Sequence, residues 1–297
     1  MVAITSFNEA DLLSYSDEEL AGYIEGCSSS IAMRNTGTVL SQHIVAKPIP
    51  SFVDPMDEVL ALEKAQKAGV RVPSVIRIVP LNDGDTYLIM DRIYGSTLEE
   101  CWKFLNVFKT FRLAWQLRAY LRRLASVVSQ TTGGVHSGEV RSEWLQGQHG
   151  PIRHASPSAF SKYLNWWLLE CYPTACSPRP ELLFTPEPHN ILCHQDLAPR
   201  NMVVDRDGVL WLVDWRHAGF YPPIMEYAGI EADHSDMSWL WEHTWVAWWG
   251  RVRWSLFRWI ACSYDHRYSN RRGLRGLYAV YQRSLRFGSQ RPCNSEE

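Results

Sequence analysis

The spacing of apolar and polar positions changes character near residue 95. Before that point, short apolar runs separated by turn residues predict strands at 31–34, 39–47, 74–79 and 86–90. A helix is predicted to begin at Asp54 and Pro55, a good cap and a good first residue, and to end at Gly69. This part of the chain is therefore expected to be rich in strands.

Helical spacing dominates after residue 95. Ser96 and Glu99 match the capping-box pattern, which marks a helix start. A longer helix is predicted over 107–128, because its apolar residues recur every three or four positions: Leu113, Leu117, Leu121, Leu124 and Val128. Further helices are expected at 160–172 and within 237–287. The pattern predicts an α+β protein in which a small strand-rich lobe precedes a larger, mainly helical lobe.

Composition limits the classes of function. The chain has 297 residues, of which 46% are hydrophobic and 21% are charged, with a formal net charge of −2. This is enough for a real core, and the charge balance gives no reason to expect nucleic acid as a partner. No secretory signal is visible, and charged residues interrupt the most apolar stretch, 239–262, so we expect a cytoplasmic protein without a membrane partner. The odd number of cysteines predicts free thiols, and nothing in the sequence indicates an oligomeric state.

The segment from 193 to 215 carries the most informative chemistry. Two β-prone runs, 202–204 and 209–213, surround the turn Asp205–Gly208 and predict a tight hairpin. Because the strands of a hairpin fold back on each other, Asn201 and Asp214 are expected at the same end, with Asp196 on the loop leading in. Two carboxylates and an amide oxygen would then converge. These are ligands that Mg²⁺ accepts, and Mg²⁺ prefers to share its coordination shell with phosphates and water.

This spacing, His194-Gln195-Asp196 followed by Asn201, a hairpin and Asp214, matches the catalytic loop of the protein-kinase-like superfamily. Residues 39–229 resemble the aminoglycoside phosphotransferase and choline-kinase-like enzymes within it, especially a fungal group. The segments at 88–98 and 213–227 also carry the resemblance. It implies a bilobal protein-kinase-like fold, with a nucleotide-binding N-lobe at 1–93 and a C-lobe at 94–297 that holds the catalytic loop and the acceptor.

The resemblance also implies roles for particular residues. Asp196 would orient or deprotonate the acceptor hydroxyl, and Asn201 and Asp214 would hold Mg²⁺. Lys47 would contact the α- and β-phosphates of ATP. The cofactors would be ATP and Mg²⁺, and the γ-phosphate would move to a hydroxyl of a small molecule, such as an amine-bearing alcohol or a secondary metabolite.

Two further contacts follow from the same resemblance. Glu58 would pair with Lys47, although Glu63 lies on the same predicted helix and is the alternative. The backbone of Asp91 to Ile93 would hydrogen-bond the adenine. His194 is expected to be a buried, hydrogen-bonded organiser of the loop rather than a proton carrier.

The sequence departs from the superfamily in its phosphate-binding loop. A G-x-G-x-x-G run is absent, and the best substitute is the segment 26–30, with one glycine. Ala198 stands where protein kinases carry a lysine, and no A-P-E motif follows Asp214. These two departures favour a small-molecule acceptor. A catalytically inactive nucleotide-binding scaffold and a protein Ser/Thr kinase remain the alternatives.

A tryptophan-rich segment lies between residues 239 and 259. We expect its rings to pack in the core, with a wall of the acceptor pocket as the alternative. Acidic residues surround this segment: Glu226, Glu231, Asp233, Asp236 and Glu242. Most are expected on the solvated surface, and a few could face a cationic acceptor.

Overall fold

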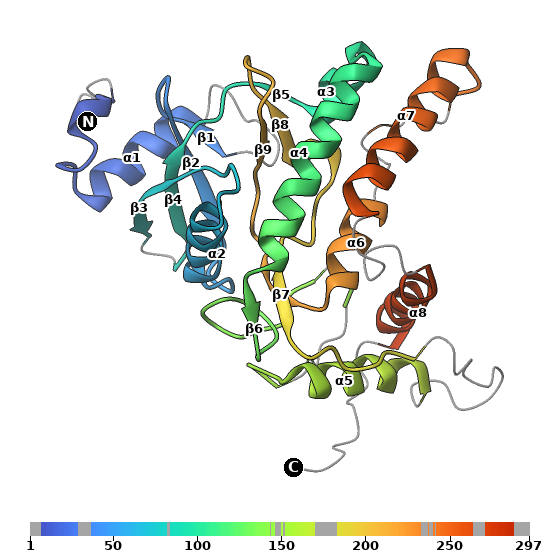
Figure 1. The fold of residues 1–297 in the computed structure, drawn as a ribbon. Coiled ribbons are helices and arrows are strands. Elements are labelled where there is room, and N and C mark those ends of the chain that lie inside the picture. Colours follow the sequence, from blue (N-terminus) through green and yellow to red (C-terminus); the bar gives the residue numbers. More distant parts are fainter. Residues whose placement is uncertain are drawn as a thin grey trace.

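The computed structural model has two lobes (Figure 1). It describes residues 7–28, 37–81, 84–142, 144–145, 150, 152–169, 183–232, 237, 240, 242–263 and 271–287. The strand expected at 31–34 lies outside the described residues.

The N-terminal lobe is built around one antiparallel sheet with strand order β1-β2-β4-β3. Its strands are β1 (Thr38–Val39), β2 (Ile44–Ile49), β3 (Val75–Pro80) and β4 (Thr86–Asp91). The prediction of one strand over 39–47 was wrong, because the chain turns between β1 and β2. The hydroxyl of Ser41 accepts the backbone N–H groups of His43 and Ile44 and thereby stabilises the turn.

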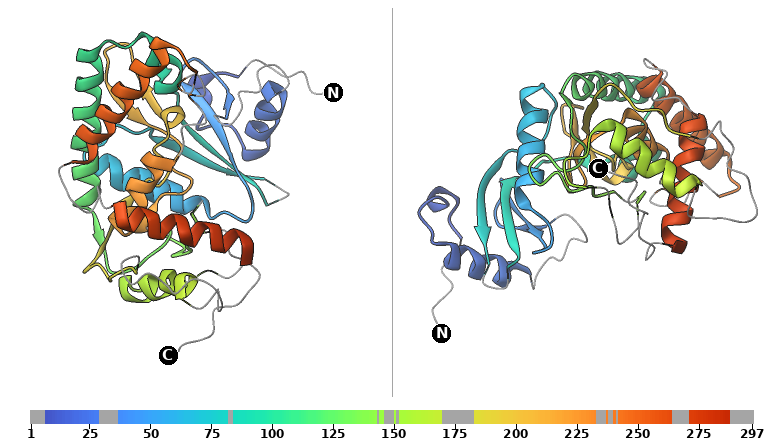
Figure 2. Two further views of the ribbon diagram at one scale, coloured as in Figure 1. Left: turned by 90° about the vertical axis from the view of Figure 1, so that its right-hand side faces the viewer. Right: turned by 90° about the horizontal axis from the view of Figure 1, so that it is seen from below.

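A helix covers each face of this sheet, as Figure 2 shows: α1 (Asp17–Ser28) on one side and α2 (Pro55–Lys67) on the other. Successive side chains of a strand point to opposite faces. Ile89 of β4 therefore joins the cluster that contains Leu20 and Ile24 of α1, whereas Leu88 joins the cluster that contains Val59 of α2.

Helix α2 forms as the sequence predicts. The carboxylate of Asp54 accepts the N–H of Met56 at 2.9 Å, and Pro55 takes the first position. Gly69 ends the helix in a left-handed conformation, with φ of +83°. Farther along α2, Ala61 and Leu62 are buried in the large core of the C-terminal lobe. The helix therefore packs against both lobes and couples their positions.

The C-terminal lobe contains the helices α3 (Leu98–Cys101), α4 (Val107–Ala125), α5 (Pro157–Leu169), α6 (Pro223–Ala232), α7 (Trp245–Cys262) and α8 (Arg271–Phe287). Two small antiparallel sheets, β5-β8-β9 and β10-β7-β6, lie among them. Their strands are β5 (Ser96–Thr97), β6 (Val128–Ser129), β7 (Asn190–Cys193), β8 (Met202–Val204), β9 (Leu210–Leu212) and β10 (Gly219–Tyr221). Short 3-10 helices include η1 (Glu9–Asp11), η2 (Trp102–Phe104) and η4 (Pro199–Asn201).

Two predicted boundaries in this lobe need correction. The capping box is formed by Thr97 and Glu100, one residue later than predicted, because Ser96 pairs with Val204 in β5. Helix α4 ends at Ala125. The predicted leucines are buried, but Val128 pairs with Ile191 of β7 and is exposed. The apolar spacing predicted that α4 continues to residue 128, but the pairing of Val128 with β7 requires the helix to end before it. Among the described residues, no helix is long and apolar enough to cross a membrane.

Candidate active site

The predicted hairpin is present. Strands β8 and β9 pair in antiparallel register, and Gly208 supplies the left-handed turn residue with φ of +72°. The N–H of Val213 donates to the carbonyl of Asn201 at 3.0 Å. The segments that carry Asn201 and Asp214 therefore meet at one end of the hairpin.

Lys47 joins the two lobes at this end. Its Nζ lies 2.5 Å from Oε1 of Glu58 and 2.6 Å from Oδ1 of Asp214. The side chains of Lys47 and Glu58 are almost fully buried, at 6% and 3% exposure. Glu63, the alternative partner, is exposed and faces Lys67 at 3.4 Å. A buried ion group of this kind requires all its partners, because each charge alone would be costly to desolvate.

Asp214 occupies an unusual backbone conformation for a non-glycine residue, with φ of +61°. Burial raises the pKa of its carboxyl, but the adjacent Lys47 ammonium outweighs this effect, and the pKa lies below its ordinary value. The next residue, Trp215, donates its backbone N–H to Oε1 of Glu58 at 3.2 Å. The geometry therefore holds an ionised Asp214 at the junction of β2, α2 and β9.

Asp196 lies on the loop after β7 and accepts bonds from two side chains. Asn201 donates its Nδ2 to Oδ2 of Asp196 at 2.8 Å and to the carbonyl of Asp196 at 2.9 Å. This orientation leaves Oδ1 of Asn201 for another partner. Arg200 donates Nη2 to both carboxylate oxygens of Asp196, at 2.9 and 3.1 Å.

Sequence reasoning missed Arg200. The signal that could have found it is its position four residues after Asp196, on the far side of Pro199, which starts the short helix η4. Residues 196–198 are not helical, and the turn of η4 after them brings the Arg200 side chain back to the Asp196 carboxylate.

His194 organises the loop as expected. It is fully buried. Its Nδ1 accepts the N–H of Asp196 at 3.2 Å, and its Nε2 lies 2.9 Å from the carbonyl of Val213. Burial lowers the pKa of the imidazole, so the neutral form fits this site, with Nε2 donating to Val213. The ring ties the catalytic loop to the end of β9.

Gln195 is held just as firmly, with φ of +67°. Its side chain donates to the carbonyl oxygens of His217 and Arg141, and its backbone N–H donates to Glu226 at 2.8 Å. Glu226 is buried, and burial raises the pKa of its carboxyl to about 7. Strained backbone positions such as these persist where the surroundings fix them.

These contacts correct the expectation for the acidic residues. Glu226 is buried against the catalytic loop, and Glu231 pairs with Arg258 at 2.5 Å and accepts the hydroxyl of Tyr227 at 2.9 Å. Both carboxylates thus have partners within the protein. Asp233 and Asp236 lie outside the described residues, and Glu242 is exposed.

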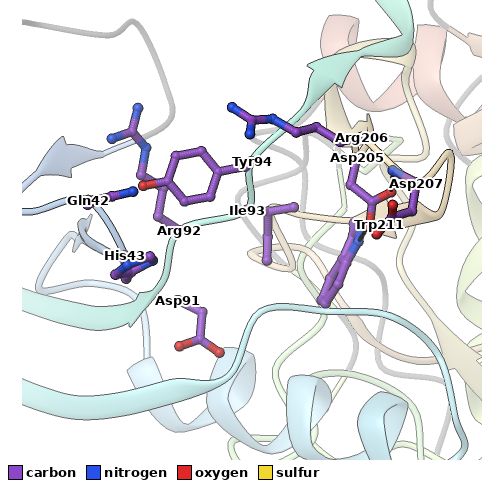
Figure 3. A pocket seen from close by; sticks show the side chains of 10 residues that line it. All are labelled: Gln42, His43, Asp91, Arg92, Ile93, Tyr94, Asp205, Arg206, Asp207 and Trp211. Atoms are coloured by element: carbon purple, nitrogen blue, oxygen red, sulfur yellow. Dashed lines mark hydrogen bonds between the residues drawn. The ribbon is translucent and has the colours of Figure 1, made fainter.

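The linker between the lobes lines a pocket of about 520 Å³ (Figure 3). Its walls are Gln42, His43, Asp91, Arg92, Ile93, Tyr94, Asp205, Arg206, Asp207 and Trp211. The N–H of Asp91 donates to Ser74, and that of Arg92 donates to His43. Among the described residues the N–H of Ile93 has no such partner. The backbone that was expected to bind adenine therefore has one free donor.

The described part of the phosphate-loop candidate 26–30 is helical and does not form the loop that the sequence suggested. Gly26, Cys27 and Ser28 form the end of α1, whose Leu20 and Ile24 are fully buried against the sheet. Ser29 and Ser30 lie outside the described residues. Apolar packing of α1 thus extends the helix into the segment that the sequence suggested as a turn.

The core interpretation of the tryptophan-rich segment holds for Trp254, which is buried and contacts Trp102 edge-on at 5.1 Å. It was wrong for four other rings, which are 41–74% exposed: Trp245, Trp248, Trp249 and Trp259. Trp239 and Trp241 lie outside the described residues. The exposed rings lie on the side of α7 that faces away from the core.

A strand-rich lobe and a helical lobe that meet at a buried lysine, two carboxylates and an asparagine define the protein-kinase-like class. Residues 41–276 match the family described as the phosphotransferase enzyme family. The chain belongs to this family. A comparison with curated protein sequences found no match.

Solved structures of aminoglycoside phosphotransferases are similar to this chain. A GDP complex of aminoglycoside 2'-phosphotransferase-IIIa shares 14% identity over 92% of this chain and 99% of that chain, with a TM-score of 0.44. Aminoglycoside phosphotransferase APH(4)-Ia shares 15% over 90% and 89%, with a TM-score of 0.49. APH(3'')-Id from Streptomyces rimosus, in complex with ADP and streptomycin, shares 16% over 80% and 87%, with a TM-score of 0.41.

Proposed function

We propose that this protein transfers the γ-phosphate of ATP, with Mg²⁺, to a hydroxyl group of a small molecule. Membership of the phosphotransferase enzyme family supports the reaction class. The observation that carries the proposal is the convergence of Lys47, Glu58, Asp196, Asn201 and Asp214 at the junction of the lobes. We also propose that the N-lobe spans 1–93 and binds the nucleotide, whereas the C-lobe spans 94–297 and binds the acceptor.

The residues present fit a Mg²⁺ ion that is shared with a nucleotide. Asn201 uses its amide nitrogen on Asp196, which leaves its oxygen for a metal, and Asp214 is ionised. Among the described residues, no group of three or more His, Cys, Asp or Glu side chains could hold a metal ion by itself. Such a small set suits Mg²⁺, which keeps water and phosphate oxygens as ligands. When bound, the ion would neutralise charge on the phosphates.

The protein's own groups position the reactants. Lys47, held by Glu58, presents its ammonium to the α- and β-phosphates. Asp196 accepts the hydrogen bond of the acceptor hydroxyl and orients its oxygen for attack. We propose Arg200 as a positioning residue, because its two contacts fix the rotamer of Asp196. The backbone around Asp91 and Ile93 would bind the adenine.

The structure around Asp214 supports a small acceptor over a polypeptide. From Asp214 the chain enters β10 at Gly219 and α6 at Pro223. This short path contrasts with the long activation segment on which protein kinases bind peptides. Ala198, at the position of the kinase lysine, is buried. A cationic acceptor is not part of the proposal, since Glu226 and Glu231 already have partners within the protein.

The decisive experiment measures transfer of radiolabelled γ-phosphate from ATP to a panel of hydroxylated amines, amino sugars and small alcohols, beside a panel of Ser/Thr peptides. Binding of ATP is measured in parallel with Mg²⁺ and with EDTA. Asn201→Ala and Asp214→Asn are the metal-site variants. Asp11→Asn, at an exposed aspartate of η1 outside the pocket, is the matched control.

We expect transfer to a small alcohol, and ATP binding that requires Mg²⁺ and is weakened in both metal-site variants but not in Asp11→Asn. ATP binding without transfer to any acceptor would favour the inactive scaffold. Transfer to peptides with none to small alcohols would favour a protein kinase. Equal ATP binding in Mg²⁺ and EDTA would contradict the metal site.

A further inference from the structure

An exposed set of aromatic side chains lies on two neighbouring helices, far along the chain from the catalytic loop. Phe104 of η2, three residues of α4 and four residues of α7 form this set, which we call the aromatic face: Phe104, Phe108, Phe111, Trp115, Trp245, Trp248, Trp249 and Trp259. Phe104 is 84% exposed and Trp245 is 74% exposed. Large contiguous apolar patches on a soluble domain mark interaction sites.

The two helices that carry these rings are neighbours. Trp102 donates its Nε1 to the carbonyl of Gly250, and Arg118 donates to the carbonyl of Ile260, so α4 and α7 run side by side in the same direction (Figure 1). The buried residues of each helix form one stripe. The exposed rings of α4 recur every three or four residues, whereas those of α7 are Trp245, Trp248 and Trp249 near its start and Trp259 ten residues later.

The aromatic face is long enough to contact an extended surface of a partner. At 1.5 Å of rise per residue, the stripe from Trp245 to Trp259 is about 21 Å long. Trp245 and Trp248 stack with ring centroids 4.7 Å apart, and Trp248 and Trp249 with centroids 6.2 Å apart. The three rings near the start of α7 therefore form one continuous apolar group.

Every charged residue of α4 and α7 is basic: Lys109, Arg112, Arg118, Arg122, Arg123, Arg251, Arg253 and Arg258. Some of them are engaged within the protein. Arg253 is buried, and Arg258 pairs with Glu231. Lys109 and Arg122 are exposed, and Arg118 lies over the ring of Trp115 at 5.0 Å. Positive charge thus borders the exposed rings.

We propose that the aromatic face binds the surface of a membrane that contains anionic lipids. Exposed tryptophans beside basic side chains are typical of helices that lie in the lipid headgroup region, where the rings enter the interface and the cations meet lipid phosphates. A second copy of the chain is a poorer occupant, because a two-fold contact would bring the basic side chains of both copies together. The sequence predicted no membrane partner; here the chain lies on the membrane and does not cross it.

The test is co-sedimentation of the full chain with vesicles of phosphatidylcholine mixed with phosphatidylserine, compared with phosphatidylcholine alone. One variant combines Trp245→Ser with Trp259→Ser. Its control is Phe52→Ser, which removes a ring that is 79% exposed elsewhere on the protein. We expect binding to the anionic vesicles, about a tenfold loss in the tryptophan variant and no loss in the control.

A second pair of variants tests the charge. Lys109→Glu with Arg122→Glu should abolish the preference for anionic vesicles and the weakening of binding by salt. Lys67→Glu with Arg153→Glu makes the same change in charge at side chains that are 77% and 65% exposed away from the face, and should keep both.

Three results would overturn the proposal. The first is absence of wild-type binding to the anionic vesicles. The second is equal binding by the tryptophan variant and the wild type. The third is a wild-type dimer that the tryptophan variant dissociates, without vesicle binding, which would assign the face to self-association. Quenching of wild-type tryptophan fluorescence by brominated anionic lipids is expected as well. This measurement needs no variant, so it decides the question even if the tryptophan variant does not fold.

Discussion

The junction of the lobes and the aromatic face depart from the usual distribution of side chains in opposite ways. At the junction, Lys47, Glu58 and Asn201 are polar and buried. On the aromatic face, Phe108, Trp245 and Trp259 are apolar and exposed. Soluble domains normally bury large apolar side chains and expose polar ones.

The comparison separates two reasons for such departures. Lys47, Glu58 and Asn201 each form side-chain hydrogen bonds within the protein, so loss of the junction should damage stability as well as activity. The aromatic face has no equivalent covering among the described residues, so its loss should leave the folded protein intact. The predictions below test this difference, beginning with the largest expected effect.

Asp196→Asn should lower kcat by about 10³-fold, because a neutral amide cannot accept the acceptor's proton or orient its hydroxyl equally well. ATP affinity should change little, since Asp196 does not hold the nucleotide. Single-turnover kinetics and equilibrium ATP binding measure the two effects. Loss of ATP binding together with normal chemistry would exclude the proposed role.

Lys47→Met should destabilise the fold by about 3–5 kcal/mol, because it leaves the carboxylates of Glu58 and Asp214 without their shared cation. Urea unfolding measures the free energy of unfolding. Lys67→Met, at an exposed lysine of α2, is the matched control and should stay within about 0.5 kcal/mol of the wild type. Similar values for the two variants would mean that the ion group does not stabilise the junction.

Glu226 should make stability depend on pH. Its folded-state pKa of about 7 lies above the ordinary value of 4.5, so the folded protein holds this proton more tightly than the unfolded chain. The resulting stabilisation is fully present below the ordinary value and is lost as the pH rises through about 7. Its full size is about 3 kcal/mol.

Unfolding of the wild type and of Glu226→Gln across this pH range measures the effect. The wild type should lose stability relative to the variant as the pH rises, since glutamine does not titrate. Parallel curves for the two proteins would show that Glu226 is not the group responsible.

Arg200→Ala should lower kcat by about tenfold and change the KM for ATP little, because Asp196 keeps its bond from Asn201 but loses the contact that fixes its rotamer. Arg200→Lys should recover part of the loss. A merely structural role would instead lower the free energy of unfolding in step with kcat. Measuring both quantities on each variant distinguishes the two roles.

Substitution of a ring on the aromatic face should have the smallest effect on the free energy of unfolding. Trp259→Ala should change the free energy of unfolding by about 0.5 kcal/mol or less, whereas Trp254→Ala, on the buried side of the same helix, should cost about 3–5 kcal/mol. Thermal and urea unfolding of the pair make the measurement. A large cost at Trp259 would mean that this ring supports the fold and would break the contrast between the two regions.

The sequence by itself determined what local rules control. The cap at Asp54, the end of α2 at Gly69, the hairpin around Gly208 and the leucine face of α4 follow from residues close to each other in the chain. The grouping of Asn201 and Asp214 also followed, because a hairpin brings its two ends together. The membership of the phosphotransferase enzyme family agrees with the resemblance carried by the catalytic-loop spacing.

The tertiary structure decided what depends on distant partners. Periodicity could not show that Val128 pairs with β7, or that Glu226 lies buried against the catalytic loop, because both facts depend on which segments pack together. The exposure of four tryptophans was misjudged for the same reason. Hydrophobicity is a property of a residue, but burial is a property of its neighbours, and those neighbours are assembled only when α4 and α7 fold onto the core.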